Sequence, residues 1–227
     1  MTFAAYPRPV RDIHQIELTT RCNLRCQYCP HPHLPRPKID MEWETFEAAL
    51  RLVAHYVAQG TQTELSLTGI GESLLHPRFI EMVAAARDVI GPNRPLVVTT
   101  NGLLLTDKMC ADLAPYHPQV FVSLHRPEKA GPAVENAKRH GILAGVNSSA
   151  AISAFNWAGQ VKWHVSAPRI QCEYLRSGWA VVLVDGRVTT CCLDASGAGV
   201  IGSVNDEPDS LMLKPYSLCG ECHMEVP

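Results

Sequence analysis

The sequence predicts an α/β fold: a partial (β/α)6 barrel of parallel strands, followed by a small C-terminal β-hairpin plus helix. Two observations favour it. Stretches with strand periodicity and stretches with helix periodicity alternate through the first part of the chain, which is typical of right-handed βαβ units around a parallel sheet. After residue 168 this alternation stops, and two β-rich runs flank Asp185-Gly186. We therefore expect a barrel domain over residues 1–167 and a second domain over residues 168–227.

The elements follow from periodicity and from turn and capping residues. The expected strands lie at residues 13–18, 63–68, 95–100, 120–125, 142–149 and 161–165. The expected helices lie at residues 43–58, 79–90, a short stretch after the N-cap Thr106, and 133–140. The first helix places its larger apolar side chains on one stripe, formed by Trp43, Phe46, Leu50, Val53 and Val57.

Composition narrows the class of protein. The 227 residues include 20 Lys plus Arg and 22 Asp plus Glu, so the chain lacks the basic field typical of nucleic-acid binding. We see no signal peptide and no apolar run of the ~20 residues that span a bilayer, and we expect a cytoplasmic protein without membrane contact. The cytosol keeps thiols reduced, so the nine cysteines favour metal binding over disulfides.

Three cysteines, Cys22, Cys26 and Cys29, follow the first expected strand, at the end of a parallel sheet where active sites gather. Structural zinc sites close with four ligands, whereas an iron-sulfur cubane held by three thiolates keeps one iron open. The spacing therefore favours an iron-sulfur cluster. The alternative is a zinc site completed by His31 or His33.

Several motifs resemble the radical S-adenosylmethionine (SAM) superfamily. The stretch CNLRCQYC matches the CxxxCxxC motif, with the aromatic Tyr28 before the last cysteine, and TGIGES (residues 68–73) resembles the Gly-Gly-Glu segment after the second strand. Residues 97–105 and 120–142 resemble the third and fourth βα units. The resemblance implies a [4Fe-4S] cluster held by the three cysteines, SAM on its open iron, and a 5'-deoxyadenosyl radical as the product of reductive SAM cleavage.

The same resemblance implies a set of SAM-binding residues: Tyr28, Gly69, Gly71, Glu72, Ser123 and Arg169. The two glycines would let backbone approach the methionine part of SAM, although an ordinary turn explains them equally well. Glu72 would accept hydrogen bonds from the SAM ammonium, or serve only as a helix-dipole partner. Ser123 would bind the ribose. Arg169 would bind the SAM carboxylate or an anionic substrate, or be a plain surface residue.

A second group of cysteines lies near the C-terminus: Cys172, Cys191, Cys192, Cys219 and Cys222. A two-residue turn at Asp185-Gly186 would point Cys191 and Cys192 to opposite faces, so we expect only one of them to be a ligand, and strand geometry does not choose. The tail resembles the auxiliary-cluster extension called SPASM, in its shortened Twitch form, and that resemblance selects Cys191. It implies a second [4Fe-4S] cluster; a zinc site made from the same cysteines is the alternative.

Four protein thiolates on the second cluster would leave it no site for substrate and suggest an electron acceptor. Length and cysteine layout resemble the Twitch alcohol dehydrogenases of aminoglycoside biosynthesis, which favours two-electron oxidation of a small molecule, with a one-electron reductant such as flavodoxin or ferredoxin. The alternatives are a peptide-modifying maturase and a non-catalytic zinc module. Glu17 and His125 are candidate proton acceptors. The alternative for each is a purely structural role. We expect a substrate cavity between the two clusters.

Overall fold

An eight-stranded sheet organises the part of the chain that the computed structural model describes, namely residues 6–148, 156–162 and 170–227. Six neighbouring strands, from β8 through β2 to β6, run parallel, and β9 and β10 continue the sheet antiparallel. In spatial order the strands are β10 (Val200–Ser203), β9 (Arg187–Thr189), β8 (Trp179–Val182), β2 (Asp12–Ile16), β3 (Leu65–Ser66), β4 (Leu96–Thr100), β5 (Gln119–Ser123) and β6 (Leu143–Asn147). The predicted α/β fold with a parallel sheet is confirmed.

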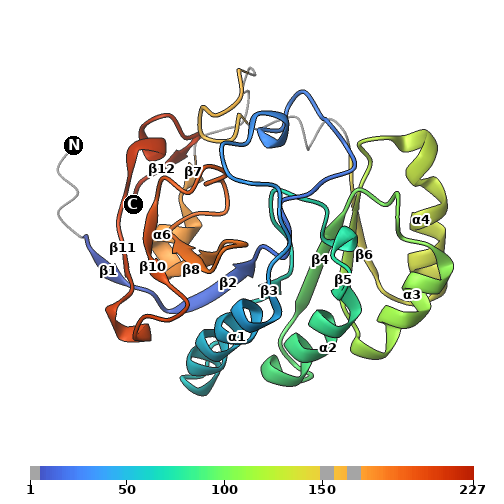
Figure 1. Cartoon of the computed structure of the whole chain (residues 1–227), viewed down its shortest axis with the longest axis horizontal. Coiled ribbons are helices and arrows are strands. Elements are labelled where there is room, and N and C mark those ends of the chain that lie inside the picture. Colours follow the sequence, from blue (N-terminus) through green and yellow to red (C-terminus); the bar gives the residue numbers. More distant parts are fainter. Residues whose placement is uncertain (1–5, 149–155, 163–169) are drawn as a thin grey trace.

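Helices connect the parallel strands and pack along the outside of the sheet (Figure 1). They are α1 (Trp43–Ala58), α2 (Phe79–Ile90), α3 (Asp107–Leu113) and α4 (Pro127–Arg139), with short 3-10 helices at His31–His33, Ser73–Leu75, Ala114–Tyr116, Pro208–Ser210 and Ser217–Gly220. The apolar stripe expected on α1 faces the core. Phe46, Leu50 and Val53 are buried, and Trp43 and Val57 are partly buried against the same core. Thr106 caps α3 as predicted, because its Oγ1 accepts the Met109 N–H at 3.1 Å.

Helix α4 starts six residues earlier than the predicted residue 133. Pro127 occupies its first turn, where a proline's fixed φ suits a helix and its missing N–H costs nothing. Pro132 then lies inside the helix and removes one backbone hydrogen bond. The buried alanines Ala130, Ala133 and Ala137 share one face, so packing against the sheet outweighs that local cost.

The C-terminal part returns to the start of the barrel. The β8–β9 hairpin lies beside β2, and two further small sheets join β1 (Arg8–Pro9) to β11 (Met212–Leu213) and β7 (Ile170–Gln171) to β12 (Met224–Glu225). Helix α6 (Glu173–Ser177) links β7 to β8. The sheet is therefore continuous from the barrel into the C-terminal part. The expected domain boundary at 167/168 and most of the expected strand at 161–165 lie outside the described residues.

The turn of the hairpin differs from the prediction. Asp185 and Gly186 do lie in the turn, but Leu183 donates its N–H to Arg187 O at 2.8 Å, so the loop has three residues and the register shifts by one. Gly186 has φ 82°, whereas Asp185 does not adopt a positive φ, and a two-residue type I′ turn requires both. Strand β9 consequently ends at Thr189, and strand alternation does not orient the cysteines that follow.

The loops that follow β2, β3, β4 and β5 lie beyond the carboxyl ends of these strands, at the top of Figure 1. Within the described residues, no helix is both long and apolar enough to cross a membrane.

Candidate functional site

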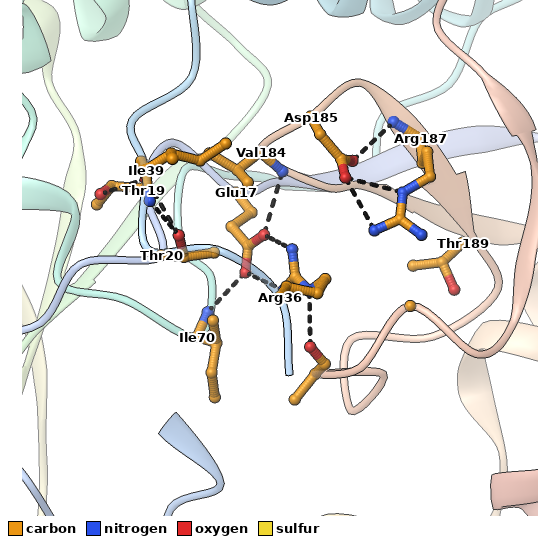
Figure 2. A network of polar contacts seen from close by, with 12 residues as sticks. Glu17, Thr19, Thr20, Arg36, Ile39, Ile70, Val184, Asp185, Arg187 and Thr189 are labelled. Atoms are coloured by element: carbon orange, nitrogen blue, oxygen red, sulfur yellow. Dashed lines mark hydrogen bonds and ion pairs between the residues drawn. The ribbon is translucent and has the colours of Figure 1, made fainter. Parts of the chain in front are cut away.

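The loop between β2 and α1 carries the first three cysteines, and hydrogen bonds fasten its two ends together. Thr19 Oγ1 donates to Asp40 Oδ1 at 2.7 Å. Thr20 Oγ1 accepts the Ile39 N–H at 2.8 Å (Figure 2). These contacts close the loop at its base. The cysteines are therefore held just past the carboxyl end of β2, as the sequence predicts.

Cys22, Cys26 and Cys29 line one cavity of about 220 Å³. Burial raises the pKa of Cys22 and raises that of Cys29 to about 11, so these thiols hold their protons near pH 7, and a bound cation would favour their thiolate forms. The Leu24 N–H donates to Cys22 Sγ at 3.4 Å. In the described part of the chain, no three Cys, His, Asp or Glu side chains are grouped to hold a single metal ion. Three thiols in one cavity fit an iron-sulfur cluster, which takes three protein ligands and keeps one iron open.

The histidines of the zinc alternative are otherwise placed. His33 is exposed, and it does not line the cavity. His31 is buried against the cavity and bonds Thr20 O through Nε2 at 2.9 Å. Its Nδ1 has no hydrogen-bond partner among the described residues, and burial lowers the pKa of the ring. An orphaned buried nitrogen at this wall fits a cavity that holds a polar group when loaded.

Most of the residues expected to bind SAM line this same cavity. It is bounded by Tyr28, Gly69, Gly71, Glu72, Ser123 and His125, and also by Thr68, Thr99, Asn101 and Trp157. Thr99 and Ser123 lie at the carboxyl ends of β4 and β5, Trp157 follows β6 in the sequence, and the others come from the loops after β2, β3, β4 and β5. The fold thus brings together residues from distant parts of the sequence. Arg169 lies outside the described residues.

Glu72 is a buried carboxylate with one acceptor position left over. Its Oε1 accepts hydrogen bonds from Thr100 Oγ1 at 2.7 Å and Leu74 N at 3.3 Å, and its Oε2 accepts one from Asn101 N at 2.8 Å. A carboxylate offers about four such positions. Burial raises the pKa of Glu72, and the hydrogen bonds oppose that rise. The side chain can therefore accept one further donor from the cavity.

Tyr28 and His125 form a pair across the cavity. Their rings stack at 5.7 Å between centroids, and Tyr28 Oη lies 2.8 Å from His125 Nδ1. The Tyr28 hydroxyl also bonds Cys26, and burial raises the pKa of Tyr28 to about 12. If the hydroxyl donates to the Cys26 sulfur, its oxygen accepts a hydrogen bond from the N–H at His125 Nδ1, which leaves Nε2 of a neutral imidazole as an acceptor. Burial lowers the pKa of His125, which favours that neutral form.

The two glycines pack closely against the chain that leaves β2. A Cβ on Gly69 would overlap the Glu17 side chain, and a Cβ on Gly71 would overlap the backbone oxygens of Thr19 and Arg21. This packing requires glycine at both positions. Both also line the first cavity, so the approach of their backbone to SAM stays a prediction.

Glu17 does not line the cavity, and its contacts are those of a structural residue (Figure 2). Arg36 donates to both of its oxygens, at 2.7 and 3.0 Å, and the backbone N–H groups of Ile70 and Val184 each donate at 3.1 Å. These four bonds fill the acceptor positions of the carboxylate. The expectation that Glu17 is a catalytic base is corrected: no lone pair remains for a substrate proton.

The second group of cysteines lines another cavity, of about 230 Å³. Its walls include Cys172, Cys191, Cys192, Cys219 and Cys222, together with Tyr174, Tyr216 and His223. Burial raises the pKa of Cys172 to about 11, and the neighbouring thiols Cys191, Cys219 and Cys222 add to that rise. The fold thus gathers the five cysteines that the sequence grouped.

Cys191 is better placed than Cys192 to join the other three cysteines. Its charge raises the pKa of Cys172, Cys219 and Cys222 alike. Its Sγ accepts the Leu193 N–H at 3.3 Å, and backbone N–H groups likewise donate to Cys219 Sγ at 3.5 Å and Cys222 Sγ at 3.4 Å. Cys192 lines the same cavity, and its thiol bonds both Cys191 and the hydroxyl of Tyr174.

Sequence reasoning missed one segment between the two cavities. Trp157 lines the first cavity, and its neighbour Ala158 lines the second. Their φ angles are 51° and 53°, and Gly159 follows at 81°. A bulky residue with positive φ is rare and costs about 1–2 kcal/mol, so this turn is strained. Nothing in the sequence pattern marks residue 157, because left-handed backbone is normally signalled by Gly, Asn or Asp.

A family model for the radical SAM superfamily matches residues 16–165, about two thirds of the chain. The chain belongs to the radical SAM superfamily. Membership implies SAM and a [4Fe-4S] cluster as cofactors.

Curated relatives match a limited stretch. The tungsten-containing aldehyde ferredoxin oxidoreductase cofactor-modifying protein of Pyrococcus furiosus is 37% identical over 99 residues, covering 44% of this chain and 26% of that protein. GTP 3',8-cyclase of Acidothermus cellulolyticus is 39% identical over 105 residues, covering 43% and 27%. Molybdenum cofactor biosynthesis protein 1 of Bos taurus is 43% identical over 93 residues, covering 40% and 14%. The matches thus span about a quarter or less of these relatives.

Solved structures resemble nearly the whole chain. BtrN in complex with AdoMet and 2-DOIA superposes with a TM-score of 0.70 at 21% identity, covering 88% of this chain and 80% of that one. The enzyme anSMEcpe with bound AdoMet and the Cp18Cys peptide gives 0.60 at 15% identity, covering 88% and 79%. At these identities the likeness is one of fold.

Proposed function

We propose that this radical SAM enzyme oxidises a small molecule by two electrons, removing a hydrogen atom, a proton and an electron from one substrate carbon–heteroatom unit. The observation that carries the proposal is the arrangement of two cysteine-lined cavities, with the Trp157–Ala158 turn contributing one residue to each. A substrate at this turn would lie within reach of both.

The first cavity supplies the ligands and the contacts for the family's cofactors. Cys22, Cys26 and Cys29 would hold the cluster, and the remaining acceptor position of Glu72 suits the SAM ammonium. Ser123 and Tyr28, in the same wall, would contact the ribose and the adenine. When bound, SAM and this cluster supply a hydrogen-abstracting radical, and a second cluster supplies an electron acceptor.

The second cavity is proposed as a Twitch/SPASM-like auxiliary site within residues 168–227. Cys172, Cys191, Cys219 and Cys222 would hold a [4Fe-4S] cluster, supported by the N–H donors on their sulfurs, which stabilise thiolate charge. Four thiolate ligands leave no position for substrate, and this favours electron transfer over substrate binding there.

His125 is the proposed proton acceptor. It lines the first cavity, its Nδ1 is held by Tyr28, and Nε2 is the nitrogen left to face a substrate. The lowered pKa keeps the imidazole neutral at pH 7, which is the state a base requires. The hydroxyl of an alcohol substrate would lose its proton to this nitrogen.

The experiment below also distinguishes two alternative functions. One is modification of a peptide, a substrate class present in the anSMEcpe structure. The other is a second cysteine site that holds zinc, in which case the C-terminal part would be a structural module.

Anaerobic reconstitution of the chain separates these readings. Two cubanes require about eight irons and eight sulfides per chain, and a flavodoxin or ferredoxin system should then drive SAM cleavage. A panel of alcohols and peptides deuterated at the reacting carbon identifies the substrate, because the deuterium appears in 5'-deoxyadenosine. Transfer from peptides alone, or four irons with one zinc, would overturn the proposal.

A further inference from the structure

A buried ion pair connects the two cysteine-bearing parts of the molecule. Glu17 follows β2, and Arg36 lies in the loop that carries the first three cysteines (Figure 2). Their side chains are only 2% and 4% exposed. The geometry is a two-pronged contact, with Arg36 Nη1 2.7 Å from Glu17 Oε2 and Arg36 Nη2 3.0 Å from Glu17 Oε1. Such a pair fixes the orientation of both groups.

The remaining bonds of the pair reach three separate segments. Glu17 accepts the Ile70 N–H, which belongs to the Gly69–Glu72 segment in the wall of the first cavity. It also accepts the Val184 N–H from the turn of the β8–β9 hairpin. Arg36 Nε donates to Ala195 O at 2.7 Å, four residues beyond Cys191. Through these backbone groups the pair touches the wall of the first cavity at Ile70, and it touches the chain on either side of Cys191 at Val184 and Ala195.

The loop that holds Ala195 is itself fixed. Asp194 accepts the backbone N–H groups of Gly197, Ala198 and Gly199 at 2.8–2.9 Å. This makes residues 194–199 a tight turn directly after Cys191 and Cys192. A displacement of that turn would pull on Arg36, and through Glu17 on Ile70.

The chain contains a second buried pair for comparison. Asp12 and Arg94 lie at the opposite end of β2, with side chains 2% and 1% exposed and a separation of 2.7 Å. In this pair Asp12 Oδ1 and Arg94 Nη1 have no partner among the described residues, and neither residue lines the two cysteine cavities. It has the same chemistry and burial as the first pair, but its further hydrogen bonds go to Thr63, Ile13 and Glu64, none of which lines either cysteine cavity.

We propose that Glu17 and Arg36 are positioning residues that make SAM binding depend on the C-terminal segment. The inference rests on the proposed location of SAM in the first cavity. The pair holds the Ile70 backbone, and with it Gly71 and Glu72, at a position set by the hairpin and by the loop after Cys191. The fork of Arg36 is essential because it bonds Glu17 and Ala195 at once. A lysine keeps the charge and has no such planar fork.

Arg36→Lys is the first test, with Arg94→Lys as the matched control. Both substitutions preserve a charge opposite a buried carboxylate, and both are measured on protein carrying the first cluster. We expect SAM affinity, measured by equilibrium dialysis, to fall about tenfold in Arg36→Lys, a typical size for coupling between sites, and to change less than twofold in Arg94→Lys. The electron paramagnetic resonance spectrum of the reduced cluster should shift less on SAM addition in Arg36→Lys.

Amide hydrogen exchange of the reconstituted protein without SAM gives a readout independent of activity. Exchange at residues 69–72 and at residues 183–186 should accelerate together in Arg36→Lys and stay unchanged in Arg94→Lys. Should Arg36→Lys fail to fold, the double substitution Glu17→Met with Arg36→Met removes both charges without burying an unpaired one.

Two kinds of result would contradict these proposals, and they differ. Unchanged SAM affinity in Arg36→Lys or in the double variant, or an equal loss in Arg94→Lys, would overturn the inference. Wild-type protein that carries the cluster and binds no SAM would instead overturn the proposed function, so the two failures are distinguishable.

Discussion

Two buried carboxylates near the first cavity have opposite roles, and their hydrogen-bond partners tell them apart. Glu17 has all of its acceptor positions filled by protein donors, whereas Glu72 has one left that faces the cavity wall. In the sequence, Glu72 is marked by the TGIGES motif, whereas Glu17 is only an acidic residue within an expected strand and could equally be catalytic or structural. The distinction depends on Arg36, Val184 and Asn101, which are distant in sequence from the carboxylate each one contacts.

Replacing Glu72 with Gln should weaken SAM binding. The amide keeps the shape but loses the charge that pairs with an ammonium, and a hydrogen bond to a charged group contributes about 1.5–3 kcal/mol. We expect a roughly 10- to 100-fold rise in the SAM dissociation constant, measured by equilibrium dialysis, with iron content unchanged. Burial raises the pKa of Glu72, so wild-type affinity should fall as pH drops through that raised pKa and the Gln variant should lack this loss. Equal affinities at pH 7 would contradict the assignment.

Replacing His125 with Asn should abolish substrate oxidation while preserving SAM cleavage. A base must be neutral, and burial lowers the pKa of His125 below its ordinary value of 6.5. The wild-type oxidation rate should therefore hold down to about pH 6.5 and fall only below it. His33→Asn is the matched control, because His33 is exposed and lies off the cavity. If the residual oxidation rate of the His125 variant still falls below pH 6.5, a group other than His125 causes that fall.

At the scale of elements, a substitution in the strained turn at Trp157 should change substrate oxidation without lowering the stability of the fold. Trp157→Gly removes the cost of a left-handed bulky residue, so the melting temperature should stay the same or rise slightly. It also removes the indole from the first cavity, so SAM cleavage should continue while deuterium transfer from substrate falls. Ala158→Gly relieves equal strain and leaves the indole in place. Equal loss of transfer in both variants would show that backbone rigidity, and not the indole, matters.

Some features of the elements follow from neighbouring residues in the sequence, and others depend on contacts between distant segments. Helices α1 and α2 match their predicted bounds because their stripes and ends are local features. The hairpin turn was located by Asp185-Gly186, yet its length depended on the φ of Asp185, which residue identity does not settle. The sequence indicates that Gly69 and Gly71 allow a close approach of the backbone, but it does not reveal that the chain leaving β2, more than forty residues away, packs against them. The choice of Cys191 over Cys192 rests on the resemblance and stays a prediction, because both cysteines line the second cavity.

At the scale of the whole molecule, the continuous sheet explains how the C-terminal part reaches the barrel's active end. Strand β8 pairs parallel with β2, so the residues after β8 emerge at the same edge as the loop after β2. The chain then turns back through β9, and Cys191, two residues beyond that strand, lines one cavity with Cys172, Cys219 and Cys222. Cys172 and Cys222 lie beside the separate β7–β12 pair. The second group of cysteines is therefore assembled from both the continuous sheet and the small C-terminal sheet.

This arrangement predicts that the two cysteine groups load independently. Cys191→Ser should reduce reconstituted iron from about eight to about four per chain, because it removes a ligand shared with three other thiols. SAM cleavage should survive, since the first cavity keeps its three cysteines, whereas oxidised product should disappear with the proposed electron acceptor. Cys192→Ser is the matched control: its thiol bonds Tyr174, so iron content and product should match wild type. Loss of four irons in Cys192→Ser, with none in Cys191→Ser, would reverse the ligand assignment and place the second site against Tyr174.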